Sequence, residues 1–219
     1  MGELNPQFQN LARDMLEKDI VKFGEFTLKS GKKSVAYVNL REMISIPKLF
    51  KGATDAYATT IRESGIRTTS DGTSFRFLNA IAEAANYYGG SVGYVLGMPL
   101  VQRRVKLKEH GQPRPVEGRF DAGNEVVLLD DVVTTSESKQ EEAKGISLIG
   151  LVPKAVVVLV DRQQGGRTEL ESQGLEFAAA LTLSGIAKYA LDEGLAGITE
   201  TMYETLLEEL DPVELATRQ

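Results

Sequence analysis

The order of apolar and polar positions along the chain predicts alternating strands and helices. Two short apolar runs, residues 126–129 and 155–160, lie between polar flanks and have the length of strands buried on both faces of a parallel sheet. A segment of helical character follows each run. Strand–helix alternation is typical of βαβ units with right-handed crossovers. The pattern therefore predicts an α/β fold with a mostly parallel central sheet.

The rest of the chain supplies further elements. Four apolar residues recur at helical spacing near its start: Phe8, Leu11, Ala12 and Met15. Pro47 is well placed to open a second helix, which Gly65 closes. Other predicted elements are extended segments at 21–30 and 35–40, a helix at 78–88 ended by Gly89 and Gly90, strands at 91–96 and 100–105, and final helices at about 184–193 and 198–210.

Composition narrows the class of protein. The chain has 219 residues, of which 42% are hydrophobic, enough for one α/β domain with a sizeable core. It contains no cysteine, which excludes disulfides, thiolate catalysis and metal sites built from cysteine. Residues 1–20 lack the apolar core of a signal peptide, and the longest apolar run is too short to span a bilayer. We expect a cytoplasmic protein.

A basic island interrupts an otherwise acidic chain of net charge −6. Its cations, opposed only by Glu109 and Glu117, are Arg103, Arg104, Lys106, Lys108, Arg114 and Arg119. Much of the island lies in residues 106–120, which are polar, contain two prolines and two glycines, and read as a long loop. A small polyanion would be a suitable partner, whereas the plainer interpretation is a solvated charged loop.

Residues 126–145 carry the most chemical information. A buried strand leads directly into Asp130 and Asp131, then into a run of small hydroxyl residues and a helix. Ligands of open parallel sheets bind beyond the carboxyl ends of the strands, and phosphate binds readily at a helix start. Two carboxylates before the turn would accept hydrogen bonds from vicinal sugar hydroxyls. The stretch predicts a site for a ribose phosphate; the alternative is a strand–turn–helix capped by serine or threonine.

The segment resembles the signature with which type I phosphoribosyltransferases bind 5-phosphoribosyl 1-diphosphate (PRPP). That signature is four apolar residues, two acids, two further residues, threonine, a small residue, glycine, any residue, and serine or threonine. The matching positions are Asp130, Asp131, Thr134, Thr135 and Ser138, whereas Ser136 replaces the glycine and Glu137 follows it. The resemblance implies that the acids hold the ribose hydroxyls. It also implies that the 5′-phosphate lies in the bend formed by Val132, Val133, Thr134, Thr135, Ser136, Glu137 and Ser138.

Three further stretches resemble the orotate phosphoribosyltransferases. Residues 23–41 resemble the hood that covers the base: Lys29 matches a lysine that contacts PRPP, and Tyr37 and Val38 fall where the family stacks against orotate. Residues 104–111 resemble the mobile catalytic loop. Arg104, Lys108 and His110 match it, and Val105 replaces a lysine.

The third stretch, residues 156–166, resembles the strand and turn whose arginine binds the orotate carboxylate. Arg162 is that arginine here, and its planar fork suits a carboxylate. Thr134 is a further expected contact of orotate. Residues 66–79 depart from the family, because the expected apolar strand is polar. By spacing, Phe75 and Arg76 match an aromatic–basic pair that would contact pyrophosphate.

The resemblance implies a type I phosphoribosyltransferase fold in one domain, residues 1–219, with an N-terminal helix and hood at about 1–45 and a core at about 46–219. It implies a homodimeric enzyme that transfers phosphoribosyl from PRPP to orotate with Mg²⁺ held mainly through PRPP and water. Lys108, His110, Asp130 and Asp131 would act in catalysis. Open alternatives are an impaired relative that binds PRPP or a nucleotide for regulation, an enzyme of the same fold for uracil or a purine, and a flavodoxin-like binding module.

Overall fold

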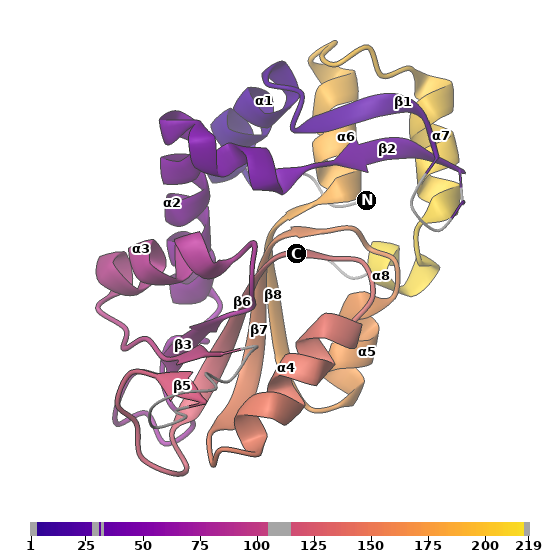
Figure 1. The fold of residues 1–219 in the computed structure, drawn as a ribbon. Coiled ribbons are helices and arrows are strands. Elements are labelled where there is room, and N and C mark those ends of the chain that lie inside the picture. Colours follow the sequence, from indigo (N-terminus) through magenta and orange to yellow (C-terminus); the bar gives the residue numbers. More distant parts are fainter. Residues whose placement is uncertain (1–3, 28–30, 32, 105–114, 217–219) are drawn as a thin grey trace.

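A parallel sheet of four strands in the order β3-β6-β7-β8 forms the centre of the computed structural model, which describes residues 4–27, 31, 33–104 and 115–216 (Figure 1). The strands are β3 (Phe77–Ala80), β6 (Glu125–Val133), β7 (Val152–Asp161) and β8 (Glu176–Thr182). Both strands predicted from the apolar runs are present, and the predicted α/β fold is confirmed.

Alternate side chains of the two central strands pack into two separate hydrophobic cores on opposite faces of the sheet. Val127 and Leu129 of β6 pack into the larger core, with Val157 of β7. Val126 and Leu128 pack into the smaller core on the opposite face. Successive side chains of a strand point to opposite faces, so a strand covered on both sides must be apolar at every position. This is why β6 and β7 read as unbroken apolar runs.

Helices cover both faces of the sheet (Figure 1). One layer holds α2 (Pro47–Glu63) and α3 (Asn86–Leu96), and the other holds α4 (Glu137–Ser147) and α5 (Gly166–Ser172). Pro47 opens α2 as predicted, and Gly65 follows its end with a φ of 74°. The first turn of α4 begins immediately beyond the carboxyl end of β6, which sets the geometry of the candidate site.

Beyond the carboxyl end of the sheet lies a further group of elements that come from the N-terminal and C-terminal parts of the chain. It contains η1 (Pro6–Phe8), α1 (Gln9–Glu17), η2 (Leu40–Ser45) and the antiparallel pair β1 (Val21–Thr27) and β2 (Lys33–Val38). The C-terminal helices α6 (Leu183–Asp192) and α7 (Glu200–Glu209) pack beside it, and α8 (Pro212–Ala216) follows. Glu209 of α7 accepts hydrogen bonds from Ser34 Oγ (2.8 Å) and Val35 N (3.0 Å). The hairpin is therefore fixed to the C-terminal helices.

The predictions for residues 66–96 were wrong in two places. Residues 77–80 form β3 and not part of a helix, and residues 91–96 belong to α3 and not to a strand. The glycines misled the prediction, because they permit close packing and do not end the helix. A Cβ on Gly89 would stand 2.9 Å from the Cβ of Ala80, so α3 can lie against β3 only with glycine there. The helix ends at Gly97, whose φ is 65°.

Next to β3, the predicted strand at 100–105 is shorter than expected. It consists of β4 (Gln102–Arg103), which pairs antiparallel with β5 (Val116–Glu117), and a parallel bridge between Leu78 and Leu100. The two short strands flank residues 105–114, which lie outside the described part of the chain.

Candidate active site

The acid pair lies at the carboxyl end of β6, where the sequence predicted it. Asp130 is only 7% exposed, and both of its carboxylate oxygens have partners. Oδ1 accepts a hydrogen bond from Asp131 N (2.9 Å), and Oδ2 lies 2.7 Å from Lys139 Nζ. The Asp131 carboxylate accepts a hydrogen bond from Val132 N on Oδ1 (2.8 Å), and within the described residues no cation is paired with it. Asp131 is therefore the acid with more free acceptor capacity.

Burial dominates the electrostatics of the pair. It raises the pKa of Asp131 to about 6, and the neighbouring charge of Asp130 acts in the same direction. Val132 N–H and Lys139 act against that rise. Two buried tyrosines, Tyr57 and Tyr88, face the pair. Tyr57 donates a hydrogen bond to the Asp130 carbonyl (2.7 Å), and burial raises its pKa well above the usual value.

The bend after β6 presents unpaired backbone N–H groups. Among the described residues, the backbone N–H groups of Thr134, Thr135 and Glu137 donate no hydrogen bond, whereas that of Ser136 faces the Glu169 carboxylate. These groups precede the first turns of α4, where the helix dipole adds partial positive charge. The bend thus has the donors that a phosphate requires.

Ser136, which replaces the family's glycine, fits this bend without strain. Its φ of −84° is ordinary for an L-residue, so no glycine is required there. Its side chain is fully buried and donates to Glu169 of α5, away from the unpaired N–H groups. Glu137 is exposed. Close packing falls instead on Gly166, where a Cβ would stand 2.6 Å from Val133 Cγ2 and 3.0 Å from Thr134 O.

Arg162 lies beside this bend, and two of its guanidinium nitrogens have no hydrogen-bond partner among the described residues. Its backbone N–H donates to Val133 O (3.0 Å), which places it next to the end of β6. Its Nε and Nη2 are buried and make no hydrogen bond in the described part of the chain. Burial lowers the pKa of Arg162, and Glu209 raises it. An unpaired buried guanidinium is costly, and an anionic ligand would supply the missing acceptors.

The other predicted site residues divide into three groups. Tyr37 is 41% exposed on β2 and its ring lies 5.6 Å from that of Phe26, whereas Val38 is partly buried against the larger core. Arg104, at the start of the basic loop, pairs with Glu117 across the β4–β5 ladder. Lys29, Lys108 and His110 lie outside the described residues.

Phe75 and Arg76 are placed at the opposite end of the sheet from the acid pair. Arg76 directly precedes β3 and is 4% exposed. It pairs with Glu125 (2.9 Å) at the start of β6 and with Glu176 (2.7 Å) at the start of β8. Phe75 stacks under the guanidinium of Arg67, 3.7 Å from ring centroid to carbon. The predicted pyrophosphate contact does not fit this placement, and Arg76 holds the amino ends of three strands together.

The sequence analysis missed the loop that follows β3. Residues 81–85 occupy the same edge of the sheet as the acid pair, since Ile81 N donates to Leu129 O (2.8 Å). The loop contains an exposed acid, Glu83, and the Ala82–Glu83 peptide bond is cis. The signal in the sequence was weak, because β3 is short and contains the polar Asn79, and the polar stretch at 67–71 precedes it. That stretch forms a hairpin in which Asp71 accepts hydrogen bonds from the Thr69 and Thr73 hydroxyls.

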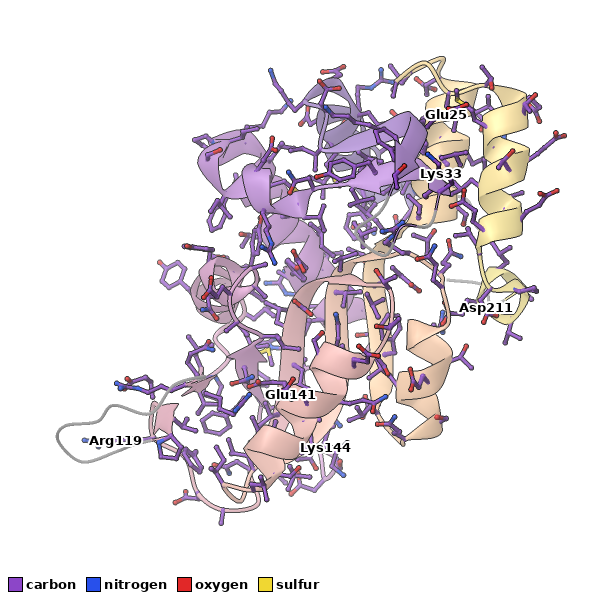
Figure 2. The ribbon with its side chains drawn as sticks, turned by 45° about the vertical axis from the view of Figure 1, so that its right-hand side comes forward. Glu25, Lys33, Arg119, Glu141, Lys144 and Asp211 are labelled. Carbon is purple, nitrogen blue, oxygen red and sulfur yellow. The ribbon has the colours of Figure 1, made fainter. Side chains whose placement is uncertain are left out.

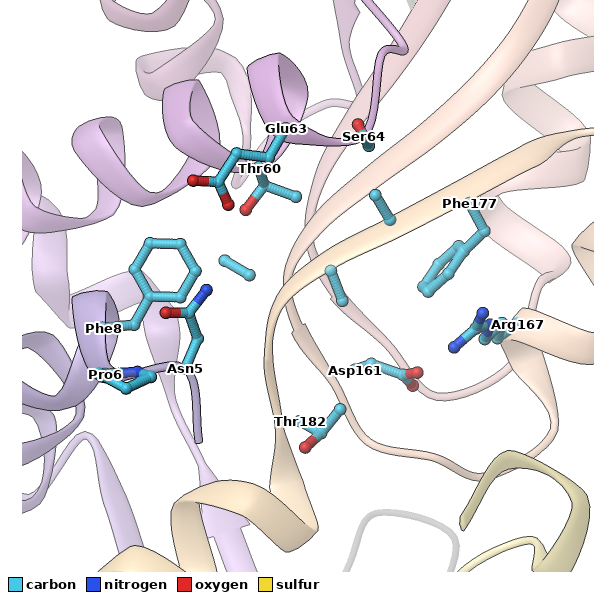
Figure 3. Close-up of a pocket in the computed structure, with 13 residues that line it drawn as sticks. Asn5, Pro6, Phe8, Thr60, Glu63, Ser64, Asp161, Arg167, Phe177 and Thr182 are labelled. Carbon is cyan, nitrogen blue, oxygen red and sulfur yellow. The ribbon is translucent and has the colours of Figure 1, made fainter. Parts of the chain in front are cut away.

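A cavity of about 560 Å³ borders the outer strand β8, and none of the predicted site residues lines it. In Figure 3 Phe8, Thr60 and Glu63 lie on one side of the β8 ribbon, and Asp161, Arg167 and Phe177 lie on the other. Within the described ranges, no three acidic or histidine side chains are grouped to hold a metal ion. None of the helices described has the length and apolar character to cross a membrane.

Comparison with known proteins gives consistent relatives. No protein-family model matches the chain. It is 33% identical over 193 residues to the orotate phosphoribosyltransferase of Pyrobaculum islandicum, covering 88% of this chain and 93% of the relative. It is 30% identical to the uridine 5′-monophosphate synthase of Caenorhabditis elegans over 86% of this chain, but spans only 37% of that longer protein. The crystal structure of orotate phosphoribosyltransferase from Aeropyrum pernix superposes with a TM-score of 0.67, at 26% identity over 81% of this chain and 96% of the other.

The parallel sheet and the acid pair before a helix start define a type I phosphoribosyltransferase. Within that class, the chain belongs to the orotate phosphoribosyltransferase family.

Proposed function

We propose that this protein transfers the 5-phosphoribosyl group from PRPP to orotate, giving orotidine 5′-monophosphate and pyrophosphate for pyrimidine synthesis. The observation that carries the proposal is the unpaired guanidinium of Arg162 beside a bend of unpaired N–H groups. Two anion positions lie side by side at the carboxyl end of one sheet. Orotidine 5′-monophosphate has two anionic groups to fill them, the base carboxylate and the 5′-phosphate.

Each part of the site has a role in this reaction. The bend 132–138 holds the 5′-phosphate, and Asp131, supported by Asp130, accepts hydrogen bonds from the ribose hydroxyls. Arg162 fixes the orotate carboxylate, with Tyr37, Val38 and Thr134 around the ring. A ring nitrogen of the base then displaces pyrophosphate at the anomeric carbon, through a state with cationic character on the sugar. The protein contributes mainly position and electrostatic complementarity.

Magnesium fits this proposal as a companion of PRPP. The described residues contain no dedicated metal cage, and Mg²⁺ commonly binds through substrate phosphates, water and few protein ligands. It would neutralise the pyrophosphate. We assign Lys29, Arg104, Lys108 and His110 to the same polyanion, on the strength of the sequence resemblance alone.

We also propose a cytoplasmic homodimer with one phosphoribosyltransferase domain per subunit and an active-site loop shared between subunits. Sedimentation at several concentrations tests the dimer. Mixing an Asp131→Asn subunit with a Lys108→Ala subunit tests the shared loop. Activity restored on mixing supports it, and no gain over the separate variants counts against it.

A direct assay tests the reaction. Purified protein is mixed with orotate, PRPP and Mg²⁺, and the loss of orotate absorbance is followed. We expect the absorbance to fall with orotate. With uracil or hypoxanthine in place of orotate, we expect no formation of the corresponding nucleotide. No turnover with any base, together with PRPP binding measured by calorimetry, would instead favour a regulatory binding protein. Glu83 at the edge of the site is the feature that keeps this second function open, since its charge would oppose a phosphate.

A further inference from the structure

The acid pair has a buried cation of its own, Lys139, which the phosphoribosyl signature does not assign. Lys139 is the third residue of α4, within its first turn, and is 4% exposed. Its Nζ contacts three acceptors: Asp130 Oδ2 (2.7 Å), Val132 O (2.6 Å) and Ser138 Oγ (3.2 Å). A buried ammonium group is stable only with such partners. Its contacts span the acid pair, the bend and the first turn of the helix.

Arg162 is the other cation near the end of β6, but in the described part of the chain it forms no ion pair with either acid. From α2 and α3 the facing titratable groups are Tyr57 and Tyr88, and burial raises the pKa of Tyr88 to about 12. Both tyrosines are therefore neutral at working pH. From β6 the facing group is Asp130 itself, and from α4 it is Lys139. Among the described residues, Lys139 is the only cation within ion-pair distance of either acid.

We infer that Lys139 is a positioning residue for the proposed reaction: it holds Asp130 in place and favours the ionised form of Asp131, so that Asp131 receives the ribose hydroxyls. Asp130 is held on both oxygens, by Lys139 and by the Asp131 N–H, and so serves as the anchor of the pair. Asp131 has the freer carboxylate. The two acids, which look equivalent in sequence, thus have different tasks. The inference rests on the proposed function for the identity of the substrate, whereas the effect of Lys139 on the two acids does not depend on it.

The test measures ionisation of Asp131 directly, by the carbon-13 shift of its carboxyl group against pH, and needs no turnover. Lys139→Met keeps most of the length of the side chain and removes the charge. The charge of Lys139 favours the ionised form of Asp131, so its loss should raise the titration midpoint of Asp131 above that of the natural protein. Lys144→Met is the matched control, because Lys144 is exposed on the same helix (Figure 2) and should leave the midpoint unchanged.

A second variant keeps the test decisive if Lys139→Met does not fold. Lys139→Gln keeps a hydrogen-bond donor towards Asp130 and removes the charge, so the Asp131 midpoint should again rise. Asp130→Asn removes the repelling carboxylate and should lower the midpoint, which calibrates the coupling within the pair. A midpoint that stays in place in both lysine variants overturns the inference.

Calorimetry with PRPP and Mg²⁺ links this result to the substrate. The pH at which PRPP binding is half lost should follow the Asp131 midpoint in each variant. Absence of PRPP binding by the natural protein would remove the proposed function, while the carboxyl titration would still decide the role of Lys139. PRPP binding whose pH dependence ignores the Asp131 midpoint would overturn the link between them.

Discussion

Replacing Arg162 with methionine should separate binding from stability. If orotate occupies the site, the guanidinium donates two hydrogen bonds to its carboxylate, each of about 1.5 kcal/mol. Their loss amounts to about 3 kcal/mol, or roughly a 100-fold fall in kcat/KM for orotate. The KM for PRPP should change little, because the bend and acid pair remain. Initial rates at varied orotate and fixed PRPP measure the effect.

The same variant should not lose stability. Within the described residues, Arg162 Nε and Nη2 are buried without hydrogen-bond partners, which costs about 1–3 kcal/mol relative to satisfied groups. Methionine removes that cost, so the melting temperature should hold or rise by a few degrees, at about 2–4 °C per kcal/mol for a chain of this size. Arg167→Met is the control, since Arg167 pairs with Glu171 and lies outside the site. A variant that melts several degrees lower with an unchanged orotate KM would refute the reasoning.

Three further predictions follow from packing and charge. Gly166→Ala should raise the KM for PRPP and cost about 1–3 kcal/mol in urea unfolding, because its Cβ would stand 2.6 Å from Val133 Cγ2; Gly90→Ala, with nothing within 4 Å, should cost nothing. Arg76→Met should lower the free energy of unfolding by roughly 2–3 kcal/mol without affecting the KM for PRPP, and a raised KM would restore its predicted pyrophosphate role. Burial raises the pKa of Asp161 to about 7. The stability that its protonated form contributes is therefore fully present below about pH 4 and is lost as the pH rises through about 7. The melting temperature of Asp161→Asn should lack this part of the pH dependence.

Local pattern was sufficient for the centre of the fold. Residues 126–129 and 155–160 are apolar at every position because two cores cover them, and that feature is visible without a structure. The acid pair could be predicted as well, since the carboxyl end of a buried strand is where such sheets bind ligands. Helices α1 and α2 followed from apolar periodicity and from the placement of Pro47.

Tertiary packing decided what local pattern could not. Gly89 and Gly90 signal a helix end by themselves, and only the proximity of Ala80 shows why α3 carries a glycine at position 89. Arg76 was matched by spacing to a pyrophosphate contact, although Glu125 and Glu176, which hold it, are distant in sequence. Lys139 carried no prediction from the sequence, and its burial against Asp130 depends on how α4 packs at the end of β6.

A structure of the protein with orotidine 5′-monophosphate tests the central claim most directly. We predict the 5′-phosphate against the N–H groups of residues 134–138, the ribose hydroxyls at Asp131, and the base carboxylate within hydrogen-bond distance of Arg162 Nε and Nη2. Nucleotide found elsewhere, such as in the cavity beside β8, with the bend and Arg162 unchanged, would contradict the account.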